Sequence, residues 1–325
     1  MKLFITGGAG FIGSNLVGRV LSDDGCDKVV IYDNLKSGSL ELIDVYLNDP
    51  RVTFVHGDIH ECERLKDAMH GCDTLIHLAA NPDISKAESE PALDFYEGTL
   101  LTQHVLESAR YNSVNNILFT SGSGVYGEVN GAIFTESYGP CFPVSPYGAA
   151  KLGSEALISA YCHMFNIRGR ALRFANVVGP NQTHGVGFDF INRLFIDKTK
   201  LKILGDGSQC KSYIYISDVL DAIQVVLKGI ESGLSFDVYN VATQDYITVT
   251  DIATLACSVV GVDSSNVEIH YSGGDRGWNG DVPRILLNTD KIRSLGWSNR
   301  YTSAEAIKRS LREMFARKML ISNQA

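Results

Sequence analysis

The first half of the chain alternates short apolar runs with longer stretches in which apolar residues recur at helical spacing. The apolar runs cover residues 3–5, 29–32, 52–55, 74–78, 116–120 and 170–174. The amphipathic stretches between them include residues 14–22, 61–70 and 92–112. Short continuous apolar runs are typical of strands buried on both faces. The alternation therefore predicts βαβ units with right-handed crossovers, and hence an α/β fold with a doubly wound parallel sheet.

The pattern changes after residues 176–180, where loops rich in Gly, Asn and Asp appear together with shorter helices. We interpret this part as a second, smaller C-terminal α/β domain that lies over the first. Residues 212–241 return to a strand–helix–strand pattern. We therefore assign residues 1–176 and the returning segment 212–241 to the first domain, and residues 177–211 and 242–325 to the second.

A glycine-rich turn joins the first predicted strand to the first predicted helix. Residues 6–13 read TGGAGFIG. In such a turn one glycine allows a sharp bend, one lets the backbone approach a pyrophosphate, and one lets the helix pack closely on the strand. The free N–H groups and the positive dipole end of the helix favour phosphate. We predict a Rossmann-type dinucleotide site at Gly7, Gly10, Phe11, Ile12 and Gly13.

An acidic residue at the end of the second predicted strand indicates which dinucleotide is bound. Asp33 follows Gly13 by 20 residues. A carboxylate at that distance accepts hydrogen bonds from an adenosine ribose and repels a 2′-phosphate, which favours NAD over NADP. The alternative is a structural one, in which Asp33 caps a turn together with Asn34.

The third and fourth predicted strands end in further candidate cofactor residues. Asp58 and Ile59 follow the third strand, and Asp58 is expected to face the adenine edge. The fourth strand ends at Leu78, Ala79 and Ala80, where two small side chains let the backbone lie against a cofactor.

Composition and charge exclude several other classes of protein. The 325 residues carry a net charge of −8 and no long basic run, which argues against nucleic acid and anionic membranes as partners. No apolar stretch has the length of a membrane span, and the N-terminus does not read as a signal peptide. Seven cysteines without CxxC spacing indicate reduced thiols and a cytoplasmic location. His56 and His60 are spaced like ligands on a helix, but they lie at a strand end and loop, so we predict no metal site.

The strongest catalytic pattern is SPYGAAK at residues 145–151. Tyr147 and Lys151 are four residues apart at the predicted start of a helix, so they share one face. A free phenol has a pKa of about 10, and a nearby ammonium and a nicotinamide cation are expected to lower it by about 1–3 units. A phenolate beside NAD⁺ is suited to take a proton from an alcohol while hydride leaves the same carbon. An ordinary helix with a surface lysine and a packed tyrosine is the alternative.

The chain resembles the extended short-chain dehydrogenase/reductase superfamily, and within it the UDP-galactose 4-epimerase group. The motifs that carry this resemblance span nearly the whole chain and read TGGAGFIG, YDN, GDI, HLAA, TSGSGVYGE, SPYGAAK, NVVGP, GDGSQCKSYIY and GWNGDV. The resemblance implies tightly held NAD, a UDP-sugar substrate, a second domain that binds the nucleotide sugar, and a homodimer formed through a four-helix bundle.

The residues before Val125 discriminate among reactions of that superfamily. The 4,6-dehydratases carry Asp and Glu there and decarboxylases carry Glu, whereas this chain has Ser123 and Gly124. The Cys expected of 3,5-epimerase/reductases is also missing from this segment. The resemblance therefore implies 4-epimerisation by transient oxidation at C4, rotation of the 4-keto sugar and re-reduction. A UDP-uronate 4-epimerase, another NDP-sugar-modifying enzyme and a non-catalytic NAD-binding sensor remain the alternatives.

Several positions depart from the family pattern. The usual catalytic Ser or Thr is replaced by Gly122, so Ser121, Ser123 or a water is expected to supply the hydroxyl. Lys211 stands where an Arg usually grips the diphosphate, and it lacks the planar fork of a guanidinium.

The remaining substrate assignments also follow from the resemblance. Arg276 is expected to contact phosphate, and Asp281 the nucleoside ribose. Asn176 and the backbone of residues 202–204, from Lys202 to Leu204, are expected to meet the substrate and the uracil. Counting on from Gly280 and Asp281, the position at which a Tyr excludes N-acetyl groups falls at Ile285, with its neighbour Leu286 as the alternative. We therefore predict activity on UDP-N-acetylglucosamine as well as on UDP-glucose.

Overall fold

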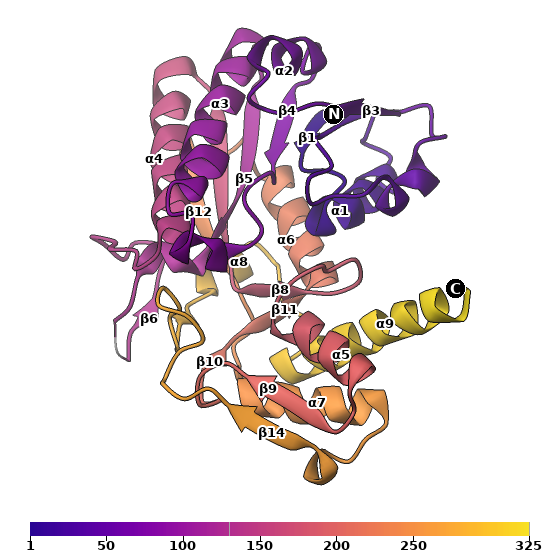
Figure 1. Cartoon of the computed structure of the whole chain (residues 1–325). Coiled ribbons are helices and arrows are strands. Elements are labelled where there is room, and N and C mark those ends of the chain that lie inside the picture. The colour runs from indigo at the N-terminus through magenta and orange to yellow at the C-terminus, as the bar shows by residue number, and fades with distance from the viewer. Residues whose placement is uncertain (130, 325) are drawn as a thin grey trace.

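The computed structural model describes residues 1–129 and 131–324. Its centre is a seven-stranded sheet in which every neighbouring pair of strands is parallel (Figure 1). The spatial order is β12 (Phe236–Val241), β7 (Arg168–Phe174), β5 (Asn116–Gly122), β4 (Thr74–His77), β1 (Lys2–Thr6), β2 (Lys28–Asp33) and β3 (Val52–His56). The chain winds outward from β1 in one direction and from β4 in the other, so the switch point lies between these two strands. The predicted Rossmann-type α/β fold is confirmed.

Helices cover both faces of this sheet (Figure 1). On one face lie α2 (Cys62–Ala68), α3 (Leu101–Tyr111) and α4 (Pro146–Phe165), and on the other lie α1 (Phe11–Leu21) and α6 (Ile216–Lys228). Successive side chains of a strand point to opposite faces of the sheet and pack in different hydrophobic clusters. On β1, Leu3 and Ile5 pack with α1 and α6, whereas Phe4 packs with α2, α3 and α4. This two-sided burial explains why the strands read as continuous apolar runs.

The amphipathic stretch 92–112 does not form one regular helix. It begins with a π-helical segment, η4 (Phe95–Leu100), and continues as α3. A Cβ atom on Gly98 would lie 3.0 Å from the Cβ of Ala150 on α4, so the two segments approach closely at this point. Single π-helical turns are frequent at functional sites, and this one borders the pocket described below.

The C-terminal part of the chain packs against the carboxyl end of the sheet (Figure 1). Its helices are α5 (Val186–Ile196), α7 (Val249–Val260), α8 (Asp290–Arg293) and α9 (Ser303–Gln324). Four two-stranded sheets accompany them, namely β9 (Lys200–Ile203) with β14 (Glu268–Tyr271), β8 (Asn176–Val178) with β11 (Tyr213–Tyr215), β10 (Cys210–Lys211) with β13 (Ile247–Thr248), and β6 (Ile133–Phe134) with β15 (Leu286–Leu287). The short helical turns are η1 (Leu40–Leu42), η2 (Asp44–Tyr46), η3 (Ile84–Glu88), η5 (Ser123–Tyr126) and η6 (Ser264–Asn266).

The two parts share one hydrophobic core, because the cluster beneath α1 and α6 continues into α5, α7 and α9. Within the returning segment, β12 joins the main sheet beside β7, whereas β11 pairs with β8 outside it. We therefore propose that the first domain comprises residues 1–176 and 212–241 and the second the remaining residues. We propose that the nucleotide sugar binds between the two domains. None of the helices described is both long and apolar enough to span a bilayer.

Candidate active site

Two glycines of the turn between β1 and α1, Gly7 and Gly13, lie where there is no room for a side chain. Gly7 has a φ of +70°, and a Cβ there would lie 2.9 Å from the backbone nitrogen of Ala79. A Cβ on Gly13 would lie 2.3 Å from the carbonyl oxygen of Gly7, whereas one on Gly10 would lie 3.3 Å from the same oxygen. Gly13 therefore permits the close packing of helix on turn, and Gly7 permits the bend.

The N-terminus of α1 is open toward the carboxyl edge of the sheet. Gly10 is the N-cap residue, so no side chain caps the helix, and the first turn contains no acidic residue. The first intrahelical bond runs from Ser14 N to Gly10 O at 2.9 Å, which leaves the N–H groups of Phe11, Ile12 and Gly13 without helical partners. This arrangement suits a diphosphate.

The Asp33 carboxylate lies directly beside the glycine turn. It accepts hydrogen bonds from Ala9 N at 3.0 Å and from Leu35 N at 2.8 Å. Burial raises the pKa of Asp33, and these backbone donors oppose the rise. Its position at the end of β2 next to the turn fits a ribose-binding carboxylate, and the bond to Leu35 N also gives it the turn-capping role considered above.

Asp58 is already engaged by neighbouring side chains. Asn34 Nδ2 donates to it at 3.0 Å, and Lys36 Nζ lies 3.0 Å from the same carboxylate. These contacts and the bond from His60 N hold the pKa of Asp58 at about 2, although burial works against them. Ile59 is buried in the core beneath this loop.

The segment after β4 forms the opposite wall. Thr6 Oγ1 accepts hydrogen bonds from Leu78 N at 3.2 Å and from Ala79 N at 3.3 Å, which fixes this backbone against the glycine turn. Ala80 lines a pocket that reaches α4. Together, the side-chain-free turn, the open helix end and the carboxylate on β2 fit the shape and charge of NAD.

Tyr147 and Lys151 share one face at the start of α4, as the spacing predicted. Ser145 caps the helix by accepting a hydrogen bond from Gly148 N at 3.1 Å, and Pro146 occupies its first turn. Lys151 is 6% exposed and donates to the carbonyl oxygen of Thr120 at 2.7 Å. Its ammonium lies 5.7 Å from the centre of the Tyr147 ring.

The expected depression of the phenol pKa by the ammonium is wrong for the chain's own groups. Burial raises the pKa of Tyr147 to about 12, and the Asp94 carboxylate adds to the rise. Burial also lowers the pKa of Lys151 to about 8, although the charges of Glu155 and Asp94 oppose this. Desolvation therefore has the larger effect on the pKa of Tyr147, in a site where Lys151 is buried and Tyr147 is half-buried.

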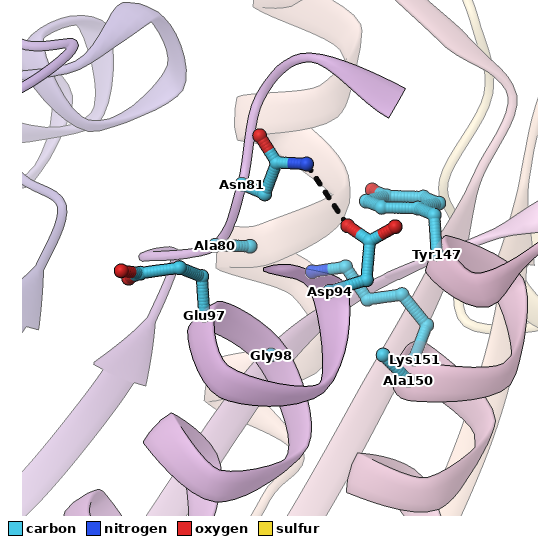
Figure 2. A pocket seen from close by; sticks show the side chains of 8 residues that line it. All are labelled: Ala80, Asn81, Asp94, Glu97, Gly98, Tyr147, Ala150 and Lys151. Atoms are coloured by element: carbon cyan, nitrogen blue, oxygen red, sulfur yellow. Dashed lines mark hydrogen bonds between the residues drawn. The ribbon is translucent and has the colours of Figure 1, made fainter. Parts of the chain in front are cut away.

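Asp94 and Asn81 complete this pocket, and the sequence patterns did not identify either of them. Figure 2 shows the Asp94 carboxylate between Asn81 and Tyr147. Asn81 Nδ2 donates to Asp94 Oδ1 at 2.9 Å. Neither residue belongs to a spaced motif, and the only local signal is an acid within the apolar face of a predicted helix.

Of the three small residues at the end of β5, Gly122 is the one that lies near Tyr147. A Cβ on Gly122 would lie 4.0 Å from Cε1 of Tyr147, with no closer contact, so this position faces the phenol as the family pattern requires. Strand alternation turns Ser121 to the opposite side, where its hydroxyl is buried and has no hydrogen-bond partner among the described residues. Ser123 begins η5 and is half-buried.

The predicted phosphate and ribose residues come together from distant segments. Lys211 and Asp281 form an ion pair, and Asp281 also accepts a hydrogen bond from Gly277 N at 3.1 Å. Arg276 lies on the same loop, where it pairs with Glu128 at 3.3 Å and donates to the carbonyl of Asp281 at 3.5 Å. The cluster contains two cations whose present partners are carboxylates.

The other predicted substrate residues are distributed around this cluster. Leu204 is exposed and lies beside Gly277, because a Cβ on Gly277 would lie 3.7 Å from that of Leu204. Asn176 is exposed and donates to the carbonyl of Ser212 at 3.2 Å. The side chain of Lys202 is exposed on β9, and no side-chain hydrogen bond or ion pair between described residues joins it to the cluster.

Ile285 is buried in a separate small core with Val125 and Tyr126, next to the segment that follows β5. In the described part of the chain, no group of three or more His, Cys, Asp or Glu side chains is arranged to hold a metal ion.

Comparison with known proteins identifies relatives over the full length of the chain. The UDP-glucose 4-epimerase of Mycolicibacterium smegmatis is 31% identical over 98% of this chain and 99% of its own. A crystal structure of a UDP-galactose 4-epimerase has a TM-score of 0.86 and 34% identity, and covers 98% of this chain and 100% of its own. A dTDP-glucose 4,6-dehydratase from Streptomyces venezuelae, solved with NAD bound, has a TM-score of 0.89 and 28% identity, with 98% of each chain covered.

The family comparison agrees with this similarity. The model of the family described as "NAD dependent epimerase/dehydratase family" matches residues 3–242, which include the glycine turn, Asp33 and the Tyr147–Lys151 pair. Because this match covers most of the chain and the parallel sheet has the corresponding topology, the chain belongs to the NAD dependent epimerase/dehydratase family.

Proposed function

We propose that the protein is an NAD-dependent 4-epimerase of UDP-hexoses, with UDP-glucose and UDP-galactose as its first substrates. The observation that carries this proposal is the Tyr147–Lys151 pair on one face of α4, combined with the absence of a carboxylate at Ser123 and Gly124. A family fold with that pair can oxidise and re-reduce a sugar carbon, and without those acids it lacks the groups for water elimination. Dehydratases share the fold to the same degree, so the residues rather than the fold support this choice.

The cofactor residues act by binding and orientation. The amides of Phe11, Ile12 and Gly13 are free to hold the pyrophosphate, and Asp33 to hold the adenosine ribose. Leu78, Ala79 and Ala80 form the wall against which the rest of the cofactor lies, with Asn34, Asp58 and Ile59 at the adenosine end. NAD, when bound, accepts hydride from the sugar carbon and returns it.

Tyr147 accepts the proton of the C4 hydroxyl and later returns it to the 4-keto sugar. Lys151 orients the nicotinamide ribose and supplies positive charge beside the phenol. We propose that Ser123 or a water supplies the hydroxyl absent at Gly122, because Ser121, whose buried hydroxyl has no partner among the described residues, lies on the side of β5 opposite the phenol.

Binding at the nucleotide end leaves the sugar free to turn. We propose that Lys211 and Arg276 exchange their carboxylate partners for the diphosphate, and that Asp281 then binds the nucleoside ribose. Asn176 and the backbone of residues 202–204, from Lys202 to Leu204, would complete the site for sugar and uracil. Firm contacts at this end and few at the hexose allow both faces of C4 to be presented.

The test is to incubate the purified protein with UDP-glucose and to follow the configuration at C4 by proton NMR. We expect a mixture of UDP-glucose and UDP-galactose with no net change in NADH absorbance. A stable 4-keto-6-deoxy product, release of CO₂ or net consumption of a nicotinamide cofactor would contradict the proposal, and turnover restricted to UDP-glucuronate would move it to the uronate epimerases.

Ile285 leads to a prediction about sugar size. We expect turnover of UDP-N-acetylglucosamine as well as UDP-glucose, because an aliphatic side chain leaves more room than a Tyr. Ile285→Tyr should lower the rate with the acetylated sugar at least about tenfold more than the rate with UDP-glucose, the effect expected of steric exclusion from a pocket. Parallel NMR assays measure both rates, with Ile285→Leu as the volume-matched control. Turnover of UDP-glucose alone by the unmodified protein would refute this assignment.

Gly122 leads to a second prediction. The residue has extended backbone (φ −149°), and a Cβ there meets only Cε1 of Tyr147 at 4.0 Å, so a larger residue fits without strain. Gly122→Ser should therefore raise kcat severalfold, the effect of one added hydrogen bond of about 1 kcal/mol. Gly122→Ala adds the Cβ without the hydroxyl and should leave kcat unchanged. Equal rates for the Ser and Ala variants would show that a hydroxyl at this position has no function here.

We further propose a homodimer formed through α3 and α4 as a four-helix bundle. These helices lie side by side on one face of the sheet (Figure 1), and α4 exposes Met164 at 74% and Phe165 at 40%. Exposed apolar side chains on one helix of such an adjacent pair are suited to contact a second copy of the same pair. All seven cysteines are free thiols, which supports a cytoplasmic location.

A further inference from the structure

A buried carboxylate beside the Tyr147–Lys151 pair has no part in the reaction proposed above. Asp94 is 1% exposed and precedes the π-helical segment η4. Its Oδ1 accepts a hydrogen bond from Asn81, while Oδ2 is buried without a hydrogen-bond partner among the described residues. Burial of a charged oxygen without a partner costs free energy. The position of this carboxylate in the pocket therefore requires a physical explanation.

The pocket holds few other charges that face Tyr147. Lys151, one helical turn further along α4, is the cation that lines the pocket. Glu155, a further turn along, is neutralised by Arg173 of β7, whose Nη2 lies 2.6 Å from the carboxylate. His77 of β4 is uncharged at neutral pH, because burial lowers its pKa to about 3.

Glu97 is the second acid that lines the pocket, but its carboxylate points away from Tyr147 (Figure 2). It lies 3.8 Å from Lys36 Nζ and 3.9 Å from His60 Nε2. The charges that act on the phenol are therefore the Lys151 ammonium and the Asp94 carboxylate, which balance each other as long as Tyr147 is protonated.

We propose that Asp94 is a positioning residue whose carboxylate, fixed by Asn81, keeps Tyr147 a phenol and Lys151 an ammonium until further positive charge enters the pocket. The inference rests on the proposed function only in taking Tyr147 as the proton acceptor. A phenolate would add a second negative charge near Asp94, and that repulsion is removed only when the oxidised cofactor brings a cation. Asp94 thus favours the phenol whenever the cofactor is reduced, which is the state in which Tyr147 must give its proton back to the sugar.

The sign of the effect follows from Coulomb's law. A nearby negative charge favours the protonated form of an acid and raises its pKa, so removing that charge lowers the pKa of Tyr147. Asp94→Asn removes the charge and keeps an oxygen that can accept the bond from Asn81. We expect the phenol pKa to fall by about 1 unit or more.

The test is an NMR titration of protein labelled with ¹³C at Cζ of tyrosine, with the Tyr147 signal assigned by its loss in Tyr147→Phe. The Tyr147 titration should move to lower pH in Asp94→Asn. In the same variant, the low-pH limb of kcat/KM should move to lower pH by the same amount, because a base must be deprotonated to act. Asp94→Ser is the second neutral variant, should the amide disturb folding, and it should shift the titration in the same direction.

Glu97→Gln is the matched control, since it removes the other acid that lines the pocket. Its Tyr147 titration should coincide with that of the unmodified protein. An unshifted Tyr147 in a folded Asp94→Asn protein, or an equal shift in Glu97→Gln, would overturn the inference. The titration needs no turnover, so a protein that fails to epimerise UDP-sugars but shows the shift would refute the proposed function and leave this inference standing.

Discussion

Replacing Tyr147 with Phe is expected to lower epimerase turnover by at least about 100-fold while the protein keeps its bound NAD. Positioned acid–base catalysis contributes about 10²–10⁴-fold to a reaction rate, and this change removes the only atom of Tyr147 that can carry the proton. The ring stays, so its packing at the start of α4 and the bond from Lys151 to the carbonyl of Thr120 are preserved. The loss should therefore appear in kcat rather than in the KM for the UDP-sugar.

Three measurements check this prediction. Turnover is followed by NMR, NAD content by absorbance after denaturation, and the folded state by thermal unfolding. Tyr111→Phe removes a hydroxyl from a tyrosine that is 67% exposed at the end of α3, and it should change none of the three. A Tyr147→Phe protein that still inverts C4 at more than a tenth of the original rate would rule out the phenol as the proton carrier.

Local sequence patterns were sufficient to predict the architecture and the two main motifs. The glycine turn and the Tyr147–Lys151 pair each lie within a few residues of one element boundary, so strand and helix periodicity alone determines how those residues lie. The alternation of apolar runs determines the parallel sheet for the same reason. The π-helical segment η4 was not predicted, because apolar spacing does not distinguish a π-helical turn from an α-helical one, and the close approach of Gly98 to Ala150 of α4 is a tertiary contact.

The electrostatics of the site could not be predicted in this way. Lys151 is adjacent to Tyr147 in helical spacing, which predicts a lowered phenol pKa. The fold buries Lys151, leaves Tyr147 half-buried and places Asp94 beside them, and desolvation raises the pKa of Tyr147 to about 12 instead. The burial of these side chains depends on every element around the pocket. The spacing of residues within α4 therefore cannot predict it.

The ion pairs at the proposed nucleotide-binding site could not be predicted from the sequence either. The ion pair between Lys211 and Asp281 joins residues 70 positions apart, and Arg276 meets Glu128 across 148 positions. The resemblance predicted a cationic site at this place, but it gave no indication that each cation is paired with a carboxylate in the chain by itself. In the proposed function, the diphosphate and the ribose replace these ion pairs, which lowers the net gain from each new contact.

Substitution of Gly13 by Ala is expected to weaken NAD binding about 100-fold, which is the second large effect expected of a single substitution. The added Cβ would lie 2.3 Å from the carbonyl oxygen of Gly7 and 2.5 Å from the Cα of Gly8, both of which are backbone atoms. Neither can rotate away as a side chain can, so the turn and the helix must separate. Overpacking of this kind costs about 3 kcal/mol, which corresponds to about a 100-fold loss of affinity if the turn that holds the cofactor absorbs the displacement.

Gly10→Ala separates this structural role of glycine from a role in contact with the cofactor. Its Cβ would meet only the carbonyl oxygen of Gly7, at 3.3 Å, so the free protein should tolerate it with little loss of thermal stability. Calorimetric titration of NAD into both proteins, after removal of bound cofactor, measures the two affinities, and thermal unfolding measures the two stabilities. Gly13→Ala should lose both affinity and stability, whereas any loss in Gly10→Ala should be confined to affinity. Normal NAD affinity in Gly13→Ala would mean that the contact between turn and helix does not shape the cofactor site, and the assignment of this turn to the pyrophosphate would fail.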